Sequence, residues 1–161
     1  MILKNKGLYL ETIINNNIND WIDKNIYIQK MSISSSIISV EENILKAKIN
    51  KNFFCDYCGI YNGQYLEFEA KETSLEYFSL HNIKKNQIEK LNLVQRFKGL
   101  SFIIIFFHNY NTFFGVSLSQ INNFQTKKIS YNWFLDNAYQ IKMINLNLQL
   151  EKFLNHLINY I

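Results

Sequence analysis

The chain has 161 residues, enough for one domain with a hydrophobic core, and its 48% hydrophobic content excludes an intrinsically disordered protein. The net charge of +4 permits binding to a polyanion such as nucleic acid but does not by itself demonstrate it. The longest apolar run, residues 102–107, is too short to cross a bilayer, and the first residues lack the apolar core of a signal peptide. We therefore expect a cytoplasmic protein that does not bind a membrane.

In chain order, the first predicted element is a helix over residues 8–22, where apolar residues recur at helical spacing. A short strand is predicted at residues 26–28. Residues 31–50 hold a serine-rich run and two β-like pieces, residues 37–40 and 44–49, whose place in the fold the pattern leaves open. The first third of the chain thus predicts a helix and a strand, followed by a stretch that the pattern does not place.

The clearest local signal is the dipeptide Asn62-Gly63, which separates two β-rich runs. A type I′ turn needs positive φ at both central positions, and Asn-Gly is a pair that adopts it readily. The pattern therefore predicts a hairpin over residues 56–71, in a register that places Asp56 opposite Glu69.

The rest of the chain continues to alternate between helix and strand patterns. A second helix is predicted at residues 82–94, and a strand at residues 101–107 is apolar throughout, as expected where both faces are covered. A strand at residues 112–116 is expected to pair with it, and residues 144–161 predict a closing amphipathic helix. We therefore expect an α/β or α+β domain with one mixed sheet flanked by helices.

The two cysteines, Cys55 and Cys58, form a single C-x-x-C pair. A structural zinc site needs about four ligands, and the three histidines lie far along the chain. A redox pair normally opens a helix, whereas this one falls in a predicted strand. We interpret both as packing cysteines in a reducing compartment.

Side-chain alternation gathers the charged residues of the predicted hairpin on one face: Asp56, Glu67, Glu69 and Lys71. Directly opposed carboxylates repel each other unless a proton or a cation lies between them, and oxygen ligands favour Mg²⁺ or Mn²⁺. The ammonium of Lys71 could orient an attacking water or offset charge on a phosphate in the transition state. This combination indicates metal-assisted phosphodiester hydrolysis.

The same residues have a simpler interpretation as an exposed hairpin face held together by salt bridges. Two further residues favour the chemical interpretation: Glu11 lies at the edge of the apolar stripe of the first helix, and Gln87 aligns with the apolar residues of the second helix and is expected to point toward the sheet. Each could also be an ordinary boundary residue. We expect these polar residues, which come from separate elements, to point toward one place.

At this point the residues resemble a known family. The pattern D-Y-x-G-x-Y-x-G-x-Y-x-x-F-E-A-K-E-T over residues 56–73 is similar to the core of RecU, the Holliday-junction resolvase of Gram-positive bacteria and their wall-less relatives. The resemblance continues through F-x-L-x-N at residues 78–82 and Gln87, and more loosely through Gly7-x-x-Leu10-Glu11. It covers most of the chain.

The resemblance implies a restriction-endonuclease-like fold of the PD-(D/E)xK superfamily, as a single domain over residues 1–161 with a stalk-like insertion at about 31–53. It implies a homodimer that nicks two like-polarity strands of a four-way DNA junction in recombination and repair, with recombination proteins as possible further partners. The implied roles by motif position are as follows: metal ligands Asp56, Glu69 and Gln87, transition-state stabiliser Lys71, and first-helix acid Glu11.

Two departures from the family pattern affect these expectations. The family has a metal-binding threonine two residues before the motif aspartate, and here that position is Phe54. The predicted register places Phe54 opposite Lys71, so we expect its ring to crowd the lysine. The stalk stretch is shorter than in the family, serine-rich and free of proline.

Junction binding requires cationic contacts to phosphates. The candidates fall near the stalk, at the second helix and in a late loop: Lys46, Lys48, Lys51, Lys84, Lys85, Lys127 and Lys128. The sequence is rich in lysine, asparagine and isoleucine, a bias typical of an AT-rich genome, so any one of these lysines could instead be an ordinary solvated residue. Arg96 is the only arginine, which limits bidentate phosphate recognition.

Three functional hypotheses remain open from the sequence. The leading one is an active, Mg²⁺-dependent dimeric junction resolvase. The second is a catalytically weak or inactive protein that binds branched DNA and assists recombination, motivated by Phe54 and the short stalk. The third is a nuclease of the same superfamily that acts on other DNA.

Overall fold

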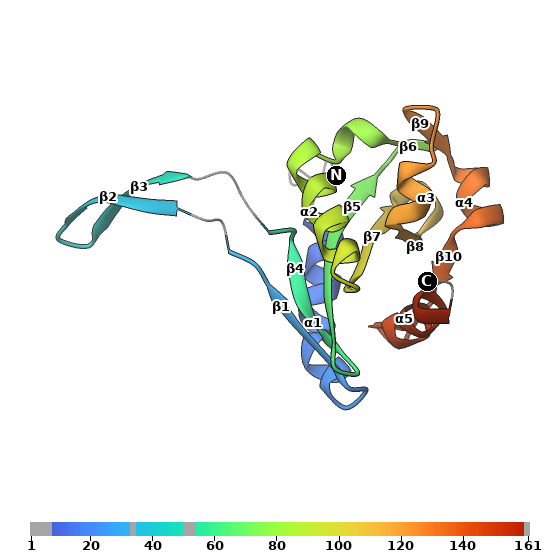
Figure 1. Cartoon of the computed structure of the whole chain (residues 1–161), viewed down its shortest axis with the longest axis horizontal. Coiled ribbons are helices and arrows are strands. Elements are labelled where there is room, and N and C mark those ends of the chain that lie inside the picture. The colour runs from blue at the N-terminus through green and yellow to red at the C-terminus, as the bar shows by residue number, and fades with distance from the viewer. Residues whose placement is uncertain (1–7, 33–34, 50–53, 160–161) are drawn as a thin grey trace.

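The structure is a computed structural model that describes residues 8–32, 35–49 and 54–159. Its centre is a six-stranded sheet of order β1-β4-β5-β7-β8-β10 (Figure 1). The strands of this sheet are β1 (Ile26–Lys30), β4 (Tyr57–Tyr61), β5 (Gln64–Thr73), β7 (Leu100–Phe107), β8 (Thr112–Ser117) and β10 (Tyr139–Ile141). The β5–β7 pair is parallel and the other pairs are antiparallel, so the sheet is mixed, as the sequence predicted.

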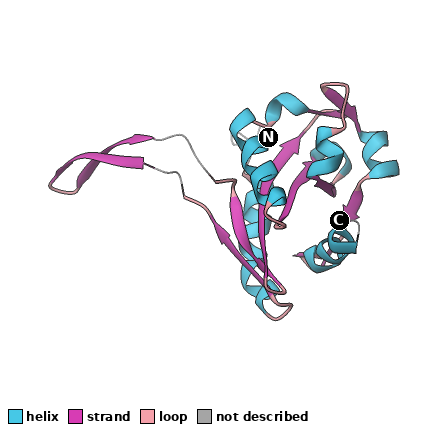
Figure 2. Ribbon diagram, in the orientation of Figure 1, coloured by secondary structure: helices cyan, strands magenta, loops and turns pink. Residues whose placement is uncertain are grey.

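Helices cover both faces of this sheet (Figure 2). The helices are α1 (Tyr9–Ile22), α2 (Lys85–Arg96), α3 (Leu118–Asn122), α4 (Tyr131–Asn137) and α5 (Leu150–Asn159). α1 and α5 contribute to one hydrophobic core, and α2, α3 and α4 contribute to the other. The central strand β7 separates the two cores: Phe102 and Ile104 belong to the first, whereas Ile103 and Ile105 belong to the second. The prediction of a strand covered on both sides is therefore confirmed.

The β4–β5 hairpin has the predicted register. Its turn residues Asn62 and Gly63 have φ values of 49° and 80°, which a type I′ turn requires. The ladder begins at Tyr61 opposite Gln64 and continues to Tyr57 opposite Phe68. Residue 56 therefore lies just beyond the end of the ladder.

A second hairpin projects away from the body of the protein (Figure 1). It consists of β2 (Ser35–Glu41) and β3 (Ile44–Ile49), which pair antiparallel with a bulge between Ile37 and Ser39. These two strands form a sheet of their own and do not join the central sheet. The β-like pieces that the sequence left unplaced are the strands of this projection.

Several elements differ from the predicted ones. The second helix begins at Lys85, because a short 3-10 helix, η1 (Leu80–Asn82), precedes it. The closing helix is confined to α5, because β11 (Met143–Ile144) and β12 (Asn147–Leu148) form a small hairpin before it. The sequence also missed α3, α4, β10 and the β6–β9 pair (Tyr77–Ser79 with Lys128–Ser130). In the described part of the chain, no helix is long and apolar enough to span a membrane.

Candidate active site

The structure brings together the three residues on which the chemical hypothesis depends. Lys71 Nζ lies 2.8 Å from Glu69 Oε2 and 3.9 Å from Asp56 Oδ2. Although Asp56 lies beyond the strand ladder, its Oδ2 accepts a hydrogen bond of 3.0 Å from the backbone N–H of Ala70. Asp56, Glu69 and Lys71 therefore form one compact group, which we call the acid–lysine centre.

Burial makes Glu69 the unusual member of the acid–lysine centre. Its side chain is fully buried, whereas Asp56 and Lys71 keep some contact with solvent. Burial, together with the neighbouring carboxylate of Asp56, raises the pKa of Glu69 to about 8, against the opposing effect of Lys71. Two acids with such different surroundings can hold one proton or one cation between them at neutral pH.

One oxygen of Glu69 is left without a partner. Oε2 is bound to Lys71, but Oε1 is buried and has no hydrogen bond to any described residue. A buried polar atom without a partner costs roughly 1–3 kcal/mol. A hard cation bound between this oxygen and the carboxylate of Asp56 would remove that free-energy cost.

The residues present fit a magnesium-type ion better than a zinc ion. Among the described residues, no three histidine, cysteine or acidic side chains are grouped closely enough to enclose a metal. Mg²⁺ does not need such an enclosure, because it keeps several waters and binds through one or two carboxylates together with substrate phosphates. Asp56 and Glu69 supply that donor set, whereas structural zinc requires four nitrogen or sulfur ligands.

Glu11 reaches the site from the opposite side of the sheet. A cavity of about 520 Å³ is lined by Glu11 from α1 and by Asp56 and Lys71 from the hairpin. Glu11 forms an ion pair with Lys30 of β1, at 2.5 Å. The cavity therefore brings together three of the predicted site residues, Glu11, Asp56 and Lys71, whereas Glu69 and Gln87 do not line it.

Gln87 occupies a different position from that of a ligand. It lies in the first turn of α2, where its Oε1 accepts a hydrogen bond of 2.9 Å from the backbone N–H of Lys84. Its side chain is thus engaged in capping the helix and does not line the cavity. The metal-binding role of Gln87 stays a prediction that would require this side chain to change its conformation.

Glu67 shares the hairpin face but belongs to a separate network. Its Oε1 accepts a hydrogen bond of 2.7 Å from the backbone N–H of Cys55. Its Oε2 accepts one of 2.8 Å from the hydroxyl of Tyr65 and lies 3.5 Å from Lys90 Nζ. Glu67 is therefore fully occupied by protein groups.

Phe54 does not lie where the sequence-based register placed it. The ladder ends at Tyr57, and the half-exposed Phe54 ring packs 4.9 Å from Lys90 Nζ. Lys71 instead contacts the two acids. The ring is therefore not expected to crowd the lysine of the site.

Sequence reasoning assigned no role to Glu72 or His108, both of which line the same cavity. Glu72 is bound to His108 and accepts a hydrogen bond of 3.3 Å from the backbone N–H of Leu10. The motif contained Glu72, but its partners come from α1 and from the residue that follows β7. Only the parallel register of β5 with β7, which pairs Thr73 with Phe107, brings His108 beside it.

The predicted DNA-binding lysines are exposed where the structure describes them. Lys46 and Lys85 each make a surface ion pair, with Glu41 and Glu89. The remaining described candidates are also exposed: Lys48, Lys84, Lys127 and Lys128. Lys51 lies outside the described residues.

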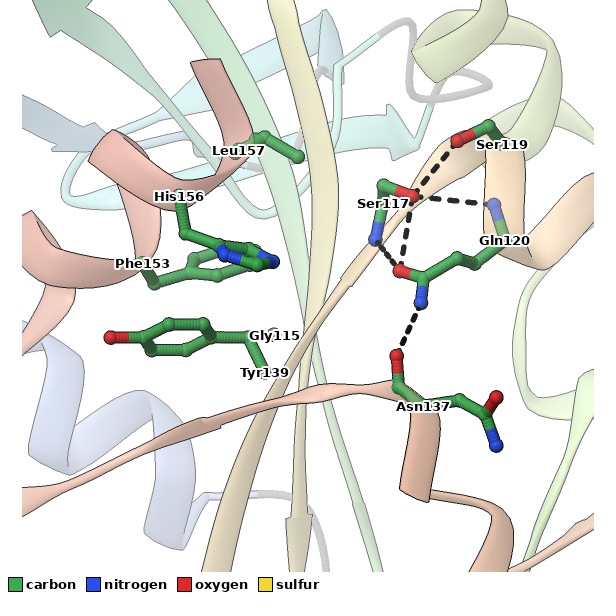
Figure 3. Close-up of a pocket in the computed structure, with 9 residues that line it drawn as sticks. All are labelled: Gly115, Ser117, Ser119, Gln120, Asn137, Tyr139, Phe153, His156 and Leu157. Carbon is green, nitrogen blue, oxygen red and sulfur yellow. Dashed lines mark hydrogen bonds between the residues drawn. The ribbon is translucent and has the colours of Figure 1, made fainter. Parts of the chain in front are cut away.

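A second cavity, of about 430 Å³, lies beneath α5 (Figure 3). Its aromatic side is formed by Tyr139, Phe153 and His156. On its polar side, Ser117 and Gln120 bind each other, so much of its hydrogen-bonding capacity is already used. No predicted site residue lines this cavity.

Comparison with solved structures gives the class of the fold. The chain superposes on Hjc of Archaeoglobus fulgidus, a Holliday junction resolvase, with a TM-score of 0.54 over 81% of this chain and 94% of that one. The two share 9% sequence identity, so the likeness establishes the fold alone. The domain therefore has the restriction-endonuclease-like fold that the sequence predicted, a mixed sheet flanked by helices.

Sequence comparison then gives the family. The family model described as Recombination protein U, RecU, matches residues 5–157. The chain is 32% identical over 146 residues to the Holliday junction resolvase RecU of Ureaplasma parvum, covering 88% of this chain and 86% of the relative. It is 35% identical over 143 residues to the RecU resolvase of Mycoplasmopsis pulmonis, covering 89% and 88%. The chain belongs to the RecU family, and the resemblance seen in residues 56–73 is confirmed.

Proposed function

We propose that this chain is a structure-specific DNA endonuclease that resolves Holliday junctions by metal-dependent phosphodiester hydrolysis. The observation that carries the proposal is the unpartnered, buried Oε1 of Glu69 beside Asp56 and Lys71. The RecU relatives and the solved structural neighbour are all described as Holliday junction resolvases. The site thus supplies the chemistry, and the relatives supply the substrate class.

Asp56 and Glu69 are the residues that would hold Mg²⁺ or Mn²⁺. Bound there, such an ion would polarise a phosphate and lower the pKa of a water. The protein's own part is to keep two carboxylates at a fixed place on a rigid hairpin. Because Glu69 is buried, its charge acts in surroundings of low dielectric constant, where electrostatic interactions are strong.

Lys71 is the group that would stabilise the transition state. Its ammonium is held by Glu69 and lies 3.9 Å from Asp56, so a phosphate bound through a cation at these two acids would lie close to it. Charge developing on the phosphate oxygens would be offset by this ammonium without movement of the side chain. Glu11, held by Lys30 in the same cavity, adds a third acid that could orient a water or a second cation.

Junction binding is assigned to the projecting hairpin and to the exposed lysines. The β2–β3 strands place Lys46 and Lys48 on a hairpin that extends beyond the body of the protein (Figure 1). Cations along such an extension would contact phosphates without reading the bases. A symmetric pair of cuts needs two copies of the site, so we include a homodimer in this proposal.

The deciding experiment incubates the protein with a synthetic four-way junction in Mg²⁺ or Mn²⁺, beside Lys71→Ala. We expect the wild type to make paired nicks and Lys71→Ala to bind the junction without cutting it. Junction binding without cleavage by the wild type would instead support the accessory-protein hypothesis, since Phe54 supplies no oxygen at the family's threonine position. Equal cleavage of linear duplex would support a nuclease of different specificity.

A further inference from the structure

Two more carboxylates on β5 flank the acid–lysine centre, and each binds a backbone amide of another segment. Glu67 Oε1 accepts the N–H of Cys55 at 2.7 Å, and Glu72 Oε1 accepts the N–H of Leu10 at 3.3 Å. Cys55 immediately precedes Asp56, and Leu10 immediately precedes Glu11. The two bonds therefore hold the chain one residue before each of the two acids that come from outside β5.

We propose that Glu67 and Glu72 are positioning residues, which fix Asp56 and Glu11 against Glu69 and Lys71. The inference deepens the proposed function and rests on it. Glu67 does not line the cavity that holds Glu11, Asp56 and Lys71. Glu72 does line it, but both of its oxygens are bound to protein groups, the Leu10 N–H and His108. Each acts through a backbone amide.

The Glu67 contact matters because the β4–β5 ladder does not reach Asp56, whose backbone carbonyl is held instead on the β1 side, by the Met31 N–H at 2.8 Å. The β4–β5 ladder ends at Tyr57, so its regular hydrogen bonds stop one residue before the acid. The bond from the Cys55 N–H to Glu67 continues the attachment on the other side of Asp56. With both neighbours held, the Asp56 carboxylate stays within reach of the Ala70 N–H.

The Glu72 contact performs the same task for α1. The first N–H groups of a helix have no partner within it, and Leu8, the residue that caps α1, makes no side-chain hydrogen bond to them. Glu72 supplies an acceptor from the sheet. The first turn of α1, which carries Glu11, is thereby tied to the strand that carries Glu69 and Lys71.

Each carboxylate is held in turn by its second oxygen. Glu67 Oε2 is bound to the Tyr65 hydroxyl and lies near Lys90 Nζ, and Glu72 Oε2 is bound to His108. Both side chains are almost completely buried. Because side chains alternate along a strand, the two residues act from opposite faces of β5. The backbone around the acid–lysine centre is therefore held by hydrogen bonds on both faces of the sheet.

The test replaces each carboxylate by an apolar residue of similar volume and by its amide. Glu67→Met combined with Lys90→Met removes the ion pair between a buried carboxylate and a partly exposed ammonium without leaving either charge alone, a change that proteins often tolerate. Glu72→Met and the amide variants Glu67→Gln and Glu72→Gln complete the set. Ser101→Ala is the matched control, because Ser101 is buried beside Glu67 in the β5–β7 register and its hydroxyl binds no described group.

Three quantities are measured: Mn²⁺ affinity by electron paramagnetic resonance, kcat on a four-way junction at saturating Mn²⁺, and the melting temperature. The Glu67→Met/Lys90→Met variant should lose roughly 10–100-fold in Mn²⁺ affinity, as expected for loss of a residue that orients a metal ligand. Glu72→Met should lower kcat about 10-fold or more with a smaller change in affinity, because Glu11 is not one of the two ligands. Both amide variants retain an acceptor and should stay within about 3-fold of wild type, as should Ser101→Ala.

The outcomes separate this inference from the proposed function. A wild type that neither binds Mn²⁺ nor cuts junctions would overturn the proposed function and the inference with it. A wild type that does both, alongside folded methionine variants with unchanged affinity and kcat, would overturn the positioning inference alone. Amide variants as impaired as the methionine variants would also overturn it, because charge rather than the hydrogen bond to the amide would then be responsible.

Discussion

The two hairpins of this protein have the same backbone architecture but differ in which side chains they bury and which they expose. Both are antiparallel pairs joined by tight turns, β4–β5 within the central sheet and β2–β3 projecting from the body (Figure 1). The inner hairpin buries charged side chains, since Glu67 and Glu69 are fully enclosed. The projecting hairpin exposes its aliphatic side chains: Ile37, Ile38, Val40, Ile44 and Leu45.

Each hairpin thus departs from the usual distribution of polar and apolar groups, and each has groups that a binding partner would satisfy or cover. For the inner hairpin the missing partner is a cation, since the Glu69 Oε1 has none among the described residues. For the projecting hairpin it is a macromolecular surface, which in our proposal is the junction. In our proposal the inner hairpin serves catalysis and the projecting hairpin serves junction binding. Variants of one hairpin should therefore affect one of these activities without the other.

Removing either proposed ligand should have the largest effect. Asp56→Asn and Glu69→Gln should each lower junction cleavage about 10³-fold or more, because a neutral amide binds a divalent ion poorly. Junction binding, measured by gel shift in Ca²⁺, should change less than about 3-fold, since the phosphate contacts lie elsewhere. Glu76→Gln makes the same chemical change at an exposed position and serves as the control. Cleavage retained by either variant would contradict the metal assignment.

The raised pKa of Glu69 predicts a strong effect of pH on metal affinity. Below its pKa of about 8 a proton occupies Glu69 and competes with the cation. Apparent Mn²⁺ affinity should therefore fall about 10-fold at pH 7 and about 100-fold at pH 6 relative to its limit at high pH. Calorimetric titration across pH 6–9 measures this fall, and a flat profile would exclude Glu69 as a ligand.

The raised pKa of Glu69 also determines how the stability of the metal-free protein changes with pH. The folded state holds the Glu69 proton more tightly than the unfolded state, so stability is lost as pH rises toward about 8. Glu69→Gln removes this loss. With EDTA present, the variant should melt several degrees above wild type at pH 8.5, where about 1 kcal/mol corresponds to roughly 2–4 °C.

The projecting hairpin offers the converse test. Ile38→Ser combined with Ile44→Ser should weaken junction binding about 10-fold, because apolar surface that DNA would cover is lost. Mn²⁺ affinity and melting temperature should not change, since both side chains are largely exposed. The matched control is Ile144→Ser combined with Leu146→Ser, an equally exposed pair on the small β11–β12 hairpin. Equal losses in the two double variants would mean that the projection makes no specific contact.

How much the sequence predicted differs between the two hairpins for a physical reason. Asn62-Gly63 fixes a turn and hence a register, so the meeting of Asp56 with Glu69 followed from local geometry. None of the side chains described in β2 and β3 is buried. The stretch that forms these strands therefore lacks the alternation that marks a strand on a core, and its position could not be inferred.

Contacts that depend on the pairing of strands far apart in the sequence could not be predicted either. Glu72 meets His108 only because β5 and β7 pair in parallel, and no local signal encodes that register. The expected contact of Phe54 with Lys71 was wrong because the strand pairing ends at Tyr57. The second helix begins at Lys85 and not at the predicted residue 82, because residue 82 ends a 3-10 turn that local spacing does not distinguish from an α-helix.

Phe54, which follows the projecting hairpin and precedes the inner one in sequence, gives the smallest expected effect. Phe54→Thr places an oxygen at the position where the family has a ligand, and we expect Mn²⁺ affinity to rise by about 2- to 5-fold. The variant also loses the stacking of Lys90 on the ring, a contribution of roughly 0.5–1 kcal/mol at an exposed site. Phe54→Leu is the control, because it loses the stacking without gaining an oxygen. If Phe54→Thr and Phe54→Leu have the same affinity, a water or a backbone carbonyl already completes the coordination.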